Sequence, residues 1–564
     1  MSVVKAMWDH ASVDVWIYLQ LIIFLSVFYF FYLFKDNIKI IYFILSLNGP
    51  PALPFLGNIN YIFDKHLLFK MSHFAYQLYG PVFRIWLTIF PFVVILEPED
   101  IQKVLGNPRH VSKGFLYNLL HNFLGKGLLT SDSETWKSHR KIIQPAFHLN
   151  VLDKFIESFN HSARKLVESF LSAGDCTNIT YLVNDCVYEV LNETIIGNER
   201  QPGSKLLNSK DSPFRQGQIS LFYRLSHPWL IFNYFYKKTE MGKREDKHYE
   251  ALFKACKNKI NETKQPNDDK NKNKKTSLLE FMVKIKSTYP EFREQDIIDE
   301  CCTFMLAGQD SVGSTIAMTL FMFAKYPRWQ NICVEEMNEI FGNDSRDPTL
   351  KDLRDMKNLE MFIKETMRLH PSVPLIGRKH IIPKGCSVLI FPQSTHRLSH
   401  HYLNPHEFDP EHFNPDRSVR RHPYAYLAFS AGPRNCIGNK FALLEMKSII
   451  SKVLRHCQLE LVPGKEKVVT KFRVTVRAKG DGQVLKSKPW GISSIFGFFS
   501  GIIYGVAMFF QTLFNPSATR YGDGYTRSYR PGSGPPRPPT SKKIHGLNLK
   551  PPSNVPGGCT SCQG

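Results

Sequence analysis

The sequence predicts a mainly α-helical protein with a small β region, a transmembrane helix at the N-terminal end and a second hydrophobic helix near the C-terminal end. Three observations lead to this prediction. Residues 15–34 form an uninterrupted apolar run, residues 294–323 read as one long helix with an apolar centre, and residues 492–514 form another apolar run. With 43% hydrophobic and 22% charged residues, the rest of the chain can bury a large core.

Charge and cysteine content narrow the classes of function. A formal net charge of +22 attracts anionic membranes, acidic proteins or nucleic acid. Paired zinc ligands and a basic region with heptads are both missing from the sequence, so a membrane and an acidic protein are the expected partners, with no nucleic acid. The 11 cysteines are scattered, odd in number and include the adjacent pair Cys301 and Cys302. This usage argues against a secreted disulfide framework and for a reducing, cytosol-facing compartment.

The N-terminal apolar run is expected to be a membrane anchor. Residues 15–34 are just long enough to cross a bilayer as a helix. A cleaved signal peptide is the alternative, but the run is longer than a signal core and no small-x-small cleavage site follows it. Because Lys35 and Lys39 flank its far end, the positive-inside rule places the following chain in the cytosol. The sequence therefore predicts an anchor over residues 1–48.

The first elements of the body are a hinge, two strands and a helix. Residues 49–54 are rich in proline, which cannot continue a helix, and should form a stiff hinge. Residues 83–87 and 92–96 are expected to be short strands separated by a turn, and Asp100 is expected to cap the helix that follows.

Two segments before the central helix are polar or aromatic. Residues 226–236 are crowded with aromatic side chains next to Lys237 and Lys238, which favours either membrane contact or a core helix. Residues 262–275 are almost entirely polar and are expected to form a mobile surface loop.

The second half of the body is predicted from its apolar segments. Helices are expected to dominate from residue 294 to about His370, followed by a strand near residues 388–391, a cysteine-bearing loop at residues 429–438 and a helix over residues 441–454. Self-similarity at solenoid period is lacking.

The strongest chemical signal is the loop Phe429-Ser-Ala-Gly-Pro-Arg-Asn-Cys-Ile-Gly438, in which Cys436 is bracketed by glycines and followed at once by a helix. Glycines let a backbone approach a flat macrocycle, and amides aimed at the sulfur would tune its electron donation. Arg434 is suited to bind a haem propionate. A lone cysteine is usually only a small buried hydrophobe, but the full spacing of this loop argues against that interpretation.

These ten residues match the signature of the cytochrome P450 superfamily, and the resemblance covers about three-quarters of the chain, from Pro50 to Lys479. The resemblance implies a triangular, mainly helical fold that binds haem b through the thiolate of Cys436. Glu365 and Arg368 resemble the family's ExxR pair, an (i, i+3) acid and base that lock the core around the cysteine loop. His412 stands where many members have arginine, and we interpret it as a variant that still completes this cluster.

Three further residues resemble the family's contacts with the haem propionates. Trp136 and Arg140 form an (i, i+4) pair that matches the WxxxR motif, although a solvated helix face would give the same spacing. Arg378 lies where the family supplies another propionate contact.

Residues 307–311, Ala-Gly-Gln-Asp-Ser, resemble the oxygen-activation motif of the family's central helix. The resemblance implies that a gap beside Gly308 admits O2, while Asp310 and Ser311 relay protons to the reacting oxygen. The family usually has threonine in place of Ser311, so proton delivery is expected to be less well controlled. The segment resembles the microsomal fatty-acid ω-hydroxylase clan, many of whose members carry a glutamate that esterifies the haem at the position of Ala307. Alanine excludes that ester and weakens the expectation of strict terminal-carbon selectivity.

A zinc site among the histidines of residues 396–412 is a competing hypothesis. The run is interrupted by Pro405 and Pro410 and lacks HExxH spacing, so the sequence disfavours it.

The C-terminal segment, residues 482–564, is different in kind. Its apolar run at residues 492–514, its tail rich in glycine, proline and arginine, and the Gly-Gly before Cys559 resemble selenoprotein K, with Cys559 in place of the family's selenocysteine and Cys562 as a candidate resolving thiol. A second anchor followed by an unstructured tail is the alternative. Because the join falls within the expected final strands of the monooxygenase, residues 483–485 are expected to replace a lost strand.

The tail also raises a topological conflict. A second spanning helix would place the tail in the lumen, yet the tail is basic, which is the cytosolic signature. Either the segment lies in the interface or re-enters, or two neighbouring genes have been joined; we favour the joined gene.

Taken together, the sequence predicts a haem-thiolate monooxygenase body at residues 49–481, held at the endoplasmic reticulum membrane and facing the cytosol. The expected reaction inserts one oxygen atom of O2 into a lipophilic substrate, with fatty acids first and steroid-like hormones or xenobiotics next. Because the chain lacks a GxGxxG fingerprint, electrons are expected from a separate NADPH-cytochrome P450 reductase, with cytochrome b5 as a second candidate donor. The rival hypothesis is a membrane adaptor that acts through its tail and carries a vestigial haem domain.

Overall fold

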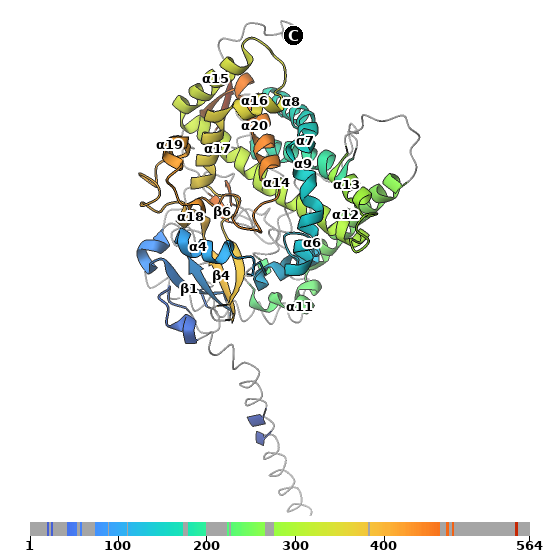
Figure 1. Ribbon diagram of the computed structural model, residues 1–564, viewed down its shortest axis with the longest axis vertical. Helices are drawn as coiled ribbons and strands as arrows, with labels where there is room; N and C mark the ends of the chain where they lie inside the picture. The colour runs from blue at the N-terminus through green and yellow to red at the C-terminus, as the bar shows by residue number, and fades with distance from the viewer. Residues whose placement is uncertain are drawn as a thin grey trace, which may run out of the picture.

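The protein is a mainly helical body with a small sheet at one side (Figure 1). The computed structural model describes residues 20–21, 24–25, 42–52, 57–58, 74–87, 90–109, 111–172, 179–198, 223–224, 227–264, 276–381, 384–462, 470–472, 476–478 and 547–550. The long helix α14, Glu294–Lys325, passes through the centre of this body. The predicted central helix over residues 294–323 is therefore confirmed, and it continues two residues further.

A four-stranded sheet joins a hairpin near the start of the body to a pair of strands from its second half. Its strands are β1 (Val82–Leu87), β2 (Phe90–Ile95), β3 (Ile376–Ile381) and β4 (Lys384–Ile390), in the order β1-β2-β4-β3. β1 and β2 form an antiparallel hairpin, and β2 pairs in parallel with β4. This parallel pairing fixes the N-terminal hairpin against a strand from the second half of the chain.

Helix α4, Pro98–Leu105, follows β2 directly. The prediction that Asp100 caps this helix is wrong. Glu97 is the N-cap residue and Asp100 lies in the first turn, where it accepts a hydrogen bond from Lys103. Pro98 determines this start, because its fixed φ suits the first helical position and its missing N–H needs no partner there.

The remaining helices cover α14 and the sheet. Those N-terminal to α14 are η1 (Phe115–Leu120), α5 (His121–Leu124), α6 (Ser133–Ile143), η2 (Gln144–Phe147), α7 (Leu149–Leu152), η3 (Asp153–Phe155), α8 (Ile156–Ser172), α9 (Ile179–Leu191), the π-helix η4 (Asn192–Ile196), η6 (Pro228–Ile231), α11 (Asn233–Lys238), α12 (Glu240–Lys264) and α13 (Leu278–Ile285). Those that follow it are α15 (Pro327–Phe341), α16 (Leu350–Asp355), α17 (Lys357–Leu369), α18 (Pro392–Thr395), η7 (Pro410–Phe413), α19 (Pro415–Ser418), η8 (Pro423–Ala425) and α20 (Asn439–His456).

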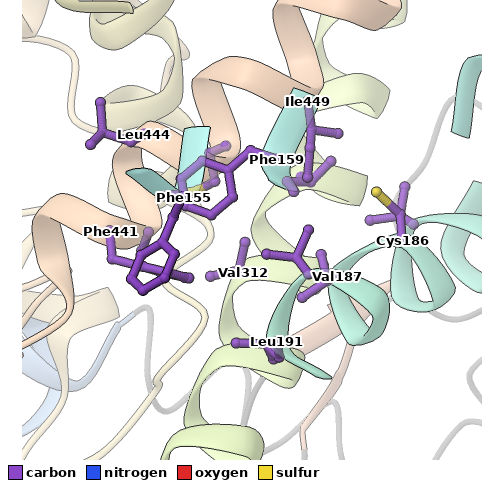
Figure 2. Packing of buried hydrophobic residues seen from close by; sticks show 14 of the residues in the cluster. Phe155, Phe159, Cys186, Val187, Leu191, Val312, Phe441, Leu444 and Ile449 are labelled. Carbon is purple, nitrogen blue, oxygen red and sulfur yellow. The ribbon is translucent and has the colours of Figure 1, made fainter. Parts of the chain in front are cut away.

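The main core lies where α8, α9, α14 and α20 meet. Figure 2 shows side chains from these helices pointing toward one another, among them Phe159, Val187, Val312 and Phe441. The rings of Phe159 and Phe441 meet edge to face with their centroids 5.0 Å apart. Close contacts of this kind hold α20, which begins directly after the cysteine loop, against α8.

Two smaller strand pairs complete the described structure. β5 (Gln458–Leu461) pairs in antiparallel fashion with β8 (Leu547–Lys550), and β6 (Thr470–Phe472) pairs with β7 (Val476–Ala478). A segment of the C-terminal region thus supplies the partner strand of β5. Residues 483–485, which we expected to replace a lost strand, lie outside the described residues.

The predicted membrane spans fall mostly on residues that the structure does not describe. Residues 492–514 lie wholly outside the described part, and only positions 20–21 and 24–25 of residues 15–34 lie within it. Within the described residues, none of the helices has the length and apolar character needed to cross a bilayer.

The aromatic segment at residues 226–236 is not a core helix. Phe232 and Tyr234 are 61% and 67% exposed and Phe235 is also exposed, whereas Tyr236 is the one buried aromatic side chain among the described residues of this segment and lies against Arg224. The expected loop at residues 262–275 begins later than predicted, because α12 runs to Lys264, and residues 265–275 lie outside the described part.

Candidate active site

The cysteine loop is a tight turn between Phe429 and the start of α20. The amide of Cys436 donates a 2.9 Å hydrogen bond to the carbonyl oxygen of Phe429. Gly432 has a φ of +74°, and a Cβ at this position would lie 1.9 Å from the carbonyl oxygen of Leu105. Only glycine can therefore occupy this position, which fixes the path of the chain into Cys436.

The thiol of Cys436 lies inside the body and still faces open space. Burial raises its pKa, while the backbone amide of Gly438 and the charge of Arg140 lower it. The side chain is nevertheless exposed. We interpret the burial of the thiol and the exposure of the side chain together: the sulfur lies deep in the protein, on the wall of an internal hollow. The N-terminus of α20 adds a favourable field for a thiolate.

One face of α14 is open although the helix is central. Phe304, Ala307, Gly308 and Ser311 repeat at intervals of three and four residues, so they share one face. Ala307 is exposed and the other three are half-buried, whereas the rest of this stretch is buried. An apolar, solvent-accessible face in the middle of a body indicates a ligand cavity.

Phe147 connects this open face with the cysteine loop. Its ring stacks on Phe304 with centroids 5.3 Å apart, and the same ring lies 3.7 Å from where a Cβ of Gly438 would be. The open face of α14 and the cysteine loop thus meet around one aromatic side chain.

The two predicted catalytic residues occupy different sides of α14. Ser311 donates a 2.6 Å hydrogen bond from its hydroxyl to the carbonyl oxygen of Ala307, one turn earlier on the open face. Asp310 is 1% exposed and points into the protein. A Cβ on Gly308 would lie 2.7 Å from a terminal methyl of Leu191, so that side chain would have to move. The proton relay through Asp310 and Ser311 stays a prediction.

Two buried arginines, Arg378 and Arg434, lie near the half-buried Lys113. Burial first, and then the charges of Arg378 and Arg434, lower the pKa of Lys113 strongly, and burial with the charge of Arg378 lowers the pKa of Arg434 to about 9. Arg378 donates a hydrogen bond to the hydroxyl oxygen of Tyr117, and the ring of Tyr117 lies 4.1 Å from the Lys113 ammonium. In the described part of the chain, none of these three cations forms an ion pair with a carboxylate. We call Lys113, Arg378 and Arg434 the basic cluster.

Arg434 is held in place by main-chain carbonyl groups. Its terminal nitrogens donate to Val111, Leu128 and Ser131 at 2.6–3.2 Å, and its guanidinium plane lies over Trp136. Its buried Nε has no hydrogen-bond partner within the described residues.

The loop that receives Arg434 is itself fixed by α14. Glu300 accepts hydrogen bonds from the Leu128 amide at 3.0 Å and from His139 Nδ1 at 2.8 Å. Burial raises the pKa of Glu300, and the bond with His139 opposes that rise. The central helix therefore positions both α6, which carries His139, and the loop beneath the basic cluster.

Arg140 contacts the cysteine loop directly. Its guanidinium donates to the carbonyl oxygen of Asn435 at 2.8 Å and to the side-chain oxygen of the same residue at 2.9 Å. Trp136, one turn earlier on α6, is buried. In this structure Arg140 supports the loop and the charge of Cys436; its contact with a propionate stays a prediction.

The ExxR pair is completely buried and fully hydrogen bonded. Arg368 makes two 2.7 Å bonds to the carboxylate of Glu365, and both side chains are 0% exposed. The remaining guanidinium donors reach the carbonyl oxygens of His396, Pro405 and Glu407. Such a pair fixes the segment that leads into the cysteine loop.

His412 completes this cluster, as we predicted from the sequence. Its Nδ1 lies 3.2 Å from Glu365, and its Nε2 lies 2.6 Å from the carbonyl oxygen of Leu403. A histidine can therefore take the place of the more common arginine, because one ring nitrogen meets the acid and the other meets the main chain. We call Glu365, Arg368 and His412 the ExxR cluster.

His396 links the ExxR cluster to the cysteine loop. Its Nδ1 lies 3.0 Å from the carbonyl oxygen of Arg368, and its Nε2 accepts a 2.7 Å hydrogen bond from the amide of Leu427. One nitrogen must donate and the other accept, so the ring is neutral. Burial lowers its pKa to about 3, which agrees with this state.

Comparison with known proteins decides the family. The family model of cytochrome P450 matches residues 47–484. The chain belongs to the cytochrome P450 family. It is similar to "Probable cytochrome P450 4aa1" of Drosophila melanogaster, with 44% identity over 82% of this chain and 94% of the relative. It is also similar to cytochrome P450 4c3 of the same fly, at 33% over 81% and 91%, and to cytochrome P450 4V2 of Mus musculus, at 30% over 72% and 83%.

Membership makes the chain a cytochrome P450 monooxygenase that binds haem through a cysteine thiolate. The residues of this P450 fit that cofactor. The side chain of Cys436 is exposed, Phe147 joins the cysteine loop to the open face of α14, and the basic cluster lacks the negative charge that haem propionates would supply.

The C-terminal segment has its own relatives. The family model of selenoprotein SelK_SelG matches residues 476–559, so the selenoprotein K-like character of this segment is confirmed. The two matched ranges overlap only at residues 476–484. The overlap contains β7, which is consistent with a join inside the final strands of the P450 fold.

Sequence reasoning missed several residues of this site. Lys113 and Tyr117 lie in a stretch without any motif, and the sequence contains no signal that would have revealed them. His139 and Glu300 are 161 positions apart, so only the fold brings them together. His396 was noticed only as a member of a histidine run.

Proposed function

We propose that this P450 inserts one oxygen atom of O2 into a C–H bond of a lipophilic substrate, a fatty acid in the first instance, with Cys436 as the thiolate ligand of haem b. The observation that carries the proposal is the placement of Cys436. Its sulfur lies inside the body but faces open space, next to the solvent-accessible apolar face of the central helix. Bound haem supplies the chemistry of O2 activation, which thiolate donation promotes.

The residues around the cofactor have separable roles in this proposal. Lys113, Arg378 and Arg434 hold the propionates through charge and hydrogen bonds, as a half-buried lysine beside two buried arginines, none of them paired with a carboxylate within the described residues, favours. Arg140 and the amide of Gly438 stabilise negative charge on the sulfur of Cys436.

The open face of α14 orients the substrate and holds the proton donor. Phe304 and Ala307 offer apolar contact and exclude water from the reacting carbon. Ser311, with Asp310 beside it in sequence, holds a proton next to that face, and its hydroxyl keeps acceptor capacity while it donates to Ala307.

The substrate class follows from this apolar lining and from the resemblance to the fatty-acid ω-hydroxylase clan. Ala307 cannot form the ester that a glutamate forms with haem, so the haem is held without an ester. Steroid-like hormones and xenobiotics are the next candidates after fatty acids.

The remaining proposals concern the location and the partners. The P450 sits on the endoplasmic reticulum membrane, with residues 1–48 as its anchor and residues 49–481 facing the cytosol. The exposed aromatic side chains Phe232, Tyr234 and Phe235 contact the membrane surface, as Tyr and Phe do at bilayer interfaces. Electrons come from NADPH-cytochrome P450 reductase, with cytochrome b5 as a second donor.

The segment at residues 482–564, with its hydrophobic helix at residues 492–514, supports a second candidate function. The match to selenoprotein SelK_SelG favours a membrane adaptor that acts through this tail and has a vestigial haem domain. Turnover by the haem domain separates the two functions.

The test is turnover by the full chain in phospholipid vesicles with NADPH, NADPH-cytochrome P450 reductase and a mixture of fatty acids, steroids and xenobiotics under isotopically labelled O2. We expect a product that gains one labelled oxygen atom and that disappears without NADPH or in Cys436→Ser. Cys457→Ser, a change at a buried cysteine outside the loop, is the matched control and should keep turnover. Bound haem with no oxygenated product from any class would favour the adaptor.

A further inference from the structure

We propose that Glu97, His400 and His401 form a zinc site on the surface of the body. One nitrogen of each imidazole and one oxygen of the carboxylate lie within 4.8 Å of one another. Two histidines and one carboxylate are a ligand set that zinc favours, with water in the fourth position. We call these three residues the zinc triad.

The distances suit a tetrahedral ion after small side-chain rotations. Ligand atoms around tetrahedral zinc lie about 3.3 Å apart. His400 Nε2 and Glu97 Oε2 are 3.1 Å apart, so this pair already has the right spacing. The side chain of His401 must close the remaining gap, which a rotation about its side-chain bonds achieves. His400 is exposed, so an ion can reach the triad from solvent.

The main chain that carries the triad is fixed on both sides. Glu97 follows β2 and is the N-cap residue of α4. The buried hydroxyl of Thr395 donates to the carbonyl oxygen of Leu96 at 2.9 Å, which joins the strand end to the segment bearing the histidines. The amide of His401 closes a turn onto the carbonyl oxygen of Leu398 at 3.0 Å. The ligands are therefore presented by a rigid frame, which lowers the cost of binding.

Two further observations favour a bound metal ion over a simple hydrogen bond between His400 and Glu97. The hydroxyl of Tyr76 hydrogen bonds to Glu97, an outer contact of the kind that orients carboxylate ligands. Nε2 of His401 is buried, and no hydrogen-bond partner for it exists within the described part of the chain. A buried nitrogen in this state is costly, and a metal ion in the triad would satisfy it once the ring turns toward Glu97.

The triad differs from the zinc site that the sequence suggested and then disfavoured. That hypothesis used only the histidines of residues 396–412. His396 and His412 are committed to the core, and the acid comes from a point some three hundred positions earlier in the chain. Pairing of β2 with β4 brings the two segments together, which spacing along the sequence cannot reveal.

Zinc in the triad would fasten α4 to the segment that closes the ExxR cluster. Just beyond His401, Leu403 accepts a hydrogen bond from His412, and Pro405 accepts one from Arg368. The ion would therefore raise resistance to unfolding without touching the face that binds haem. The site stands independently of the substrate and the oxygen chemistry.

The test measures zinc binding to the haem-loaded full chain. All proteins carry Cys559→Ser and Cys562→Ser, because free thiols also bind zinc. Zinc alone is titrated, and bound metal per haem, zinc affinity and melting temperature are measured. We expect one zinc per haem, bound at least about 100-fold more weakly in His400→Gln/His401→Gln, and about tenfold more weakly in Tyr76→Phe. Zinc should raise the melting temperature only where the triad is intact.

His406→Gln, which removes an exposed neighbouring histidine, is the matched control and should keep full affinity. The haem spectrum of every protein should be the same, which shows that each is folded. The proposal is overturned if the parent protein binds no stoichiometric zinc, if the double variant binds it as tightly as the parent, or if His406→Gln loses it equally. None of these results would bear on turnover, so failure here is distinct from failure of the proposed function.

Discussion

Two groups of charged side chains in this P450 differ in how the free-energy cost of burying charge is offset. In the ExxR cluster, Arg368 is buried against Glu365 and five hydrogen bonds satisfy its guanidinium. In the basic cluster, Arg378 and Arg434 are buried beside the half-buried Lys113, and none of the three has a carboxylate partner within the described residues. Burial of an unpaired charge is expensive, so the second arrangement is incomplete on its own.

The difference separates what the chain provides from what the cofactor provides. The ExxR cluster gives structure to the cysteine loop whether haem is bound or not. The three cations of the basic cluster repel one another, and only a bound anion removes the cost of this repulsion. Haem binding and folding are therefore coupled on that side.

The largest effect should come from Glu365→Gln, which leaves Arg368 buried without its anion. We expect a loss of about 3–5 kcal/mol in the free energy of unfolding, in both the haem-free and the haem-loaded protein. Urea unfolding of each form gives the value. Glu335→Gln, at an exposed carboxylate on α15, is the control and should change little. A destabilisation that appears only when haem is bound would contradict the claim that the ExxR cluster stabilises the fold independently of haem.

Arg378→Leu should act in opposite directions in the two forms. Removal of one cation relieves repulsion, so the haem-free protein should be as stable as the parent or more stable. The haem-loaded protein loses a propionate contact and should release haem at least about tenfold faster, as for other lost hydrogen bonds to charged groups. Haem transfer to an acceptor protein and unfolding of both forms are the measurements. Arg420→Leu, at an exposed arginine, controls for the loss of charge alone; equal destabilisation of both forms by Arg378→Leu would contradict this account.

Because His396 links the ExxR cluster to the cysteine loop, the free energy of unfolding should decrease at acid pH. Burial holds its pKa at about 3 in the folded protein, against an ordinary value of 6.5, so its contribution to stability is complete above pH 6.5 and is lost as the pH falls toward 3. His396→Gln should therefore be less stable than the parent at neutral pH but should lose stability less steeply below pH 6.5, by up to about 1.4 kcal/mol per pH unit. Unfolding of both proteins at several pH values measures the slopes. His148→Gln, at an exposed histidine, should keep the parent slope; a parent slope in His396→Gln would remove His396 from the account.

Ser311 should give the smallest effect, because it belongs to the open face and supports neither cluster. We expect Ser311→Thr to couple oxygen use to product better than the parent, since the β-branch restrains the hydroxyl, and Ser311→Ala to couple it worse. Hydrogen peroxide released per NADPH consumed is the measurement, and neither variant should change the stability of the protein. Equal leakage from all three proteins would show that Ser311 is not the relay residue.

The sequence predicted the elements that carry strong local patterns. The apolar run of α14 and the helix after Cys436 were placed within a few residues, because long periodic segments leave little choice of structure. The start of α4 was misplaced because Pro98 overrides the capping preference of Asp100.

Contacts between distant segments were beyond sequence reasoning from one chain. Lys113 joins the basic cluster only because the fold brings it to Arg378 and Arg434. Only the structure identifies His396 as the link between the ExxR cluster and the cysteine loop, because Arg368 and Leu427 lie on either side of its ring. The strand that pairs with β5, Leu547–Lys550, likewise comes from a distant segment of the chain.

The central claim is that Cys436 is the thiolate ligand on which both clusters converge. The most direct measurement is the absorption spectrum of the reduced full chain with carbon monoxide, for the parent, Cys436→Ser and Cys457→Ser. The account predicts the red-shifted Soret band of a thiolate-ligated haem in the parent and in Cys457→Ser, and its complete loss in Cys436→Ser. An unchanged band in Cys436→Ser would contradict the assignment of the site.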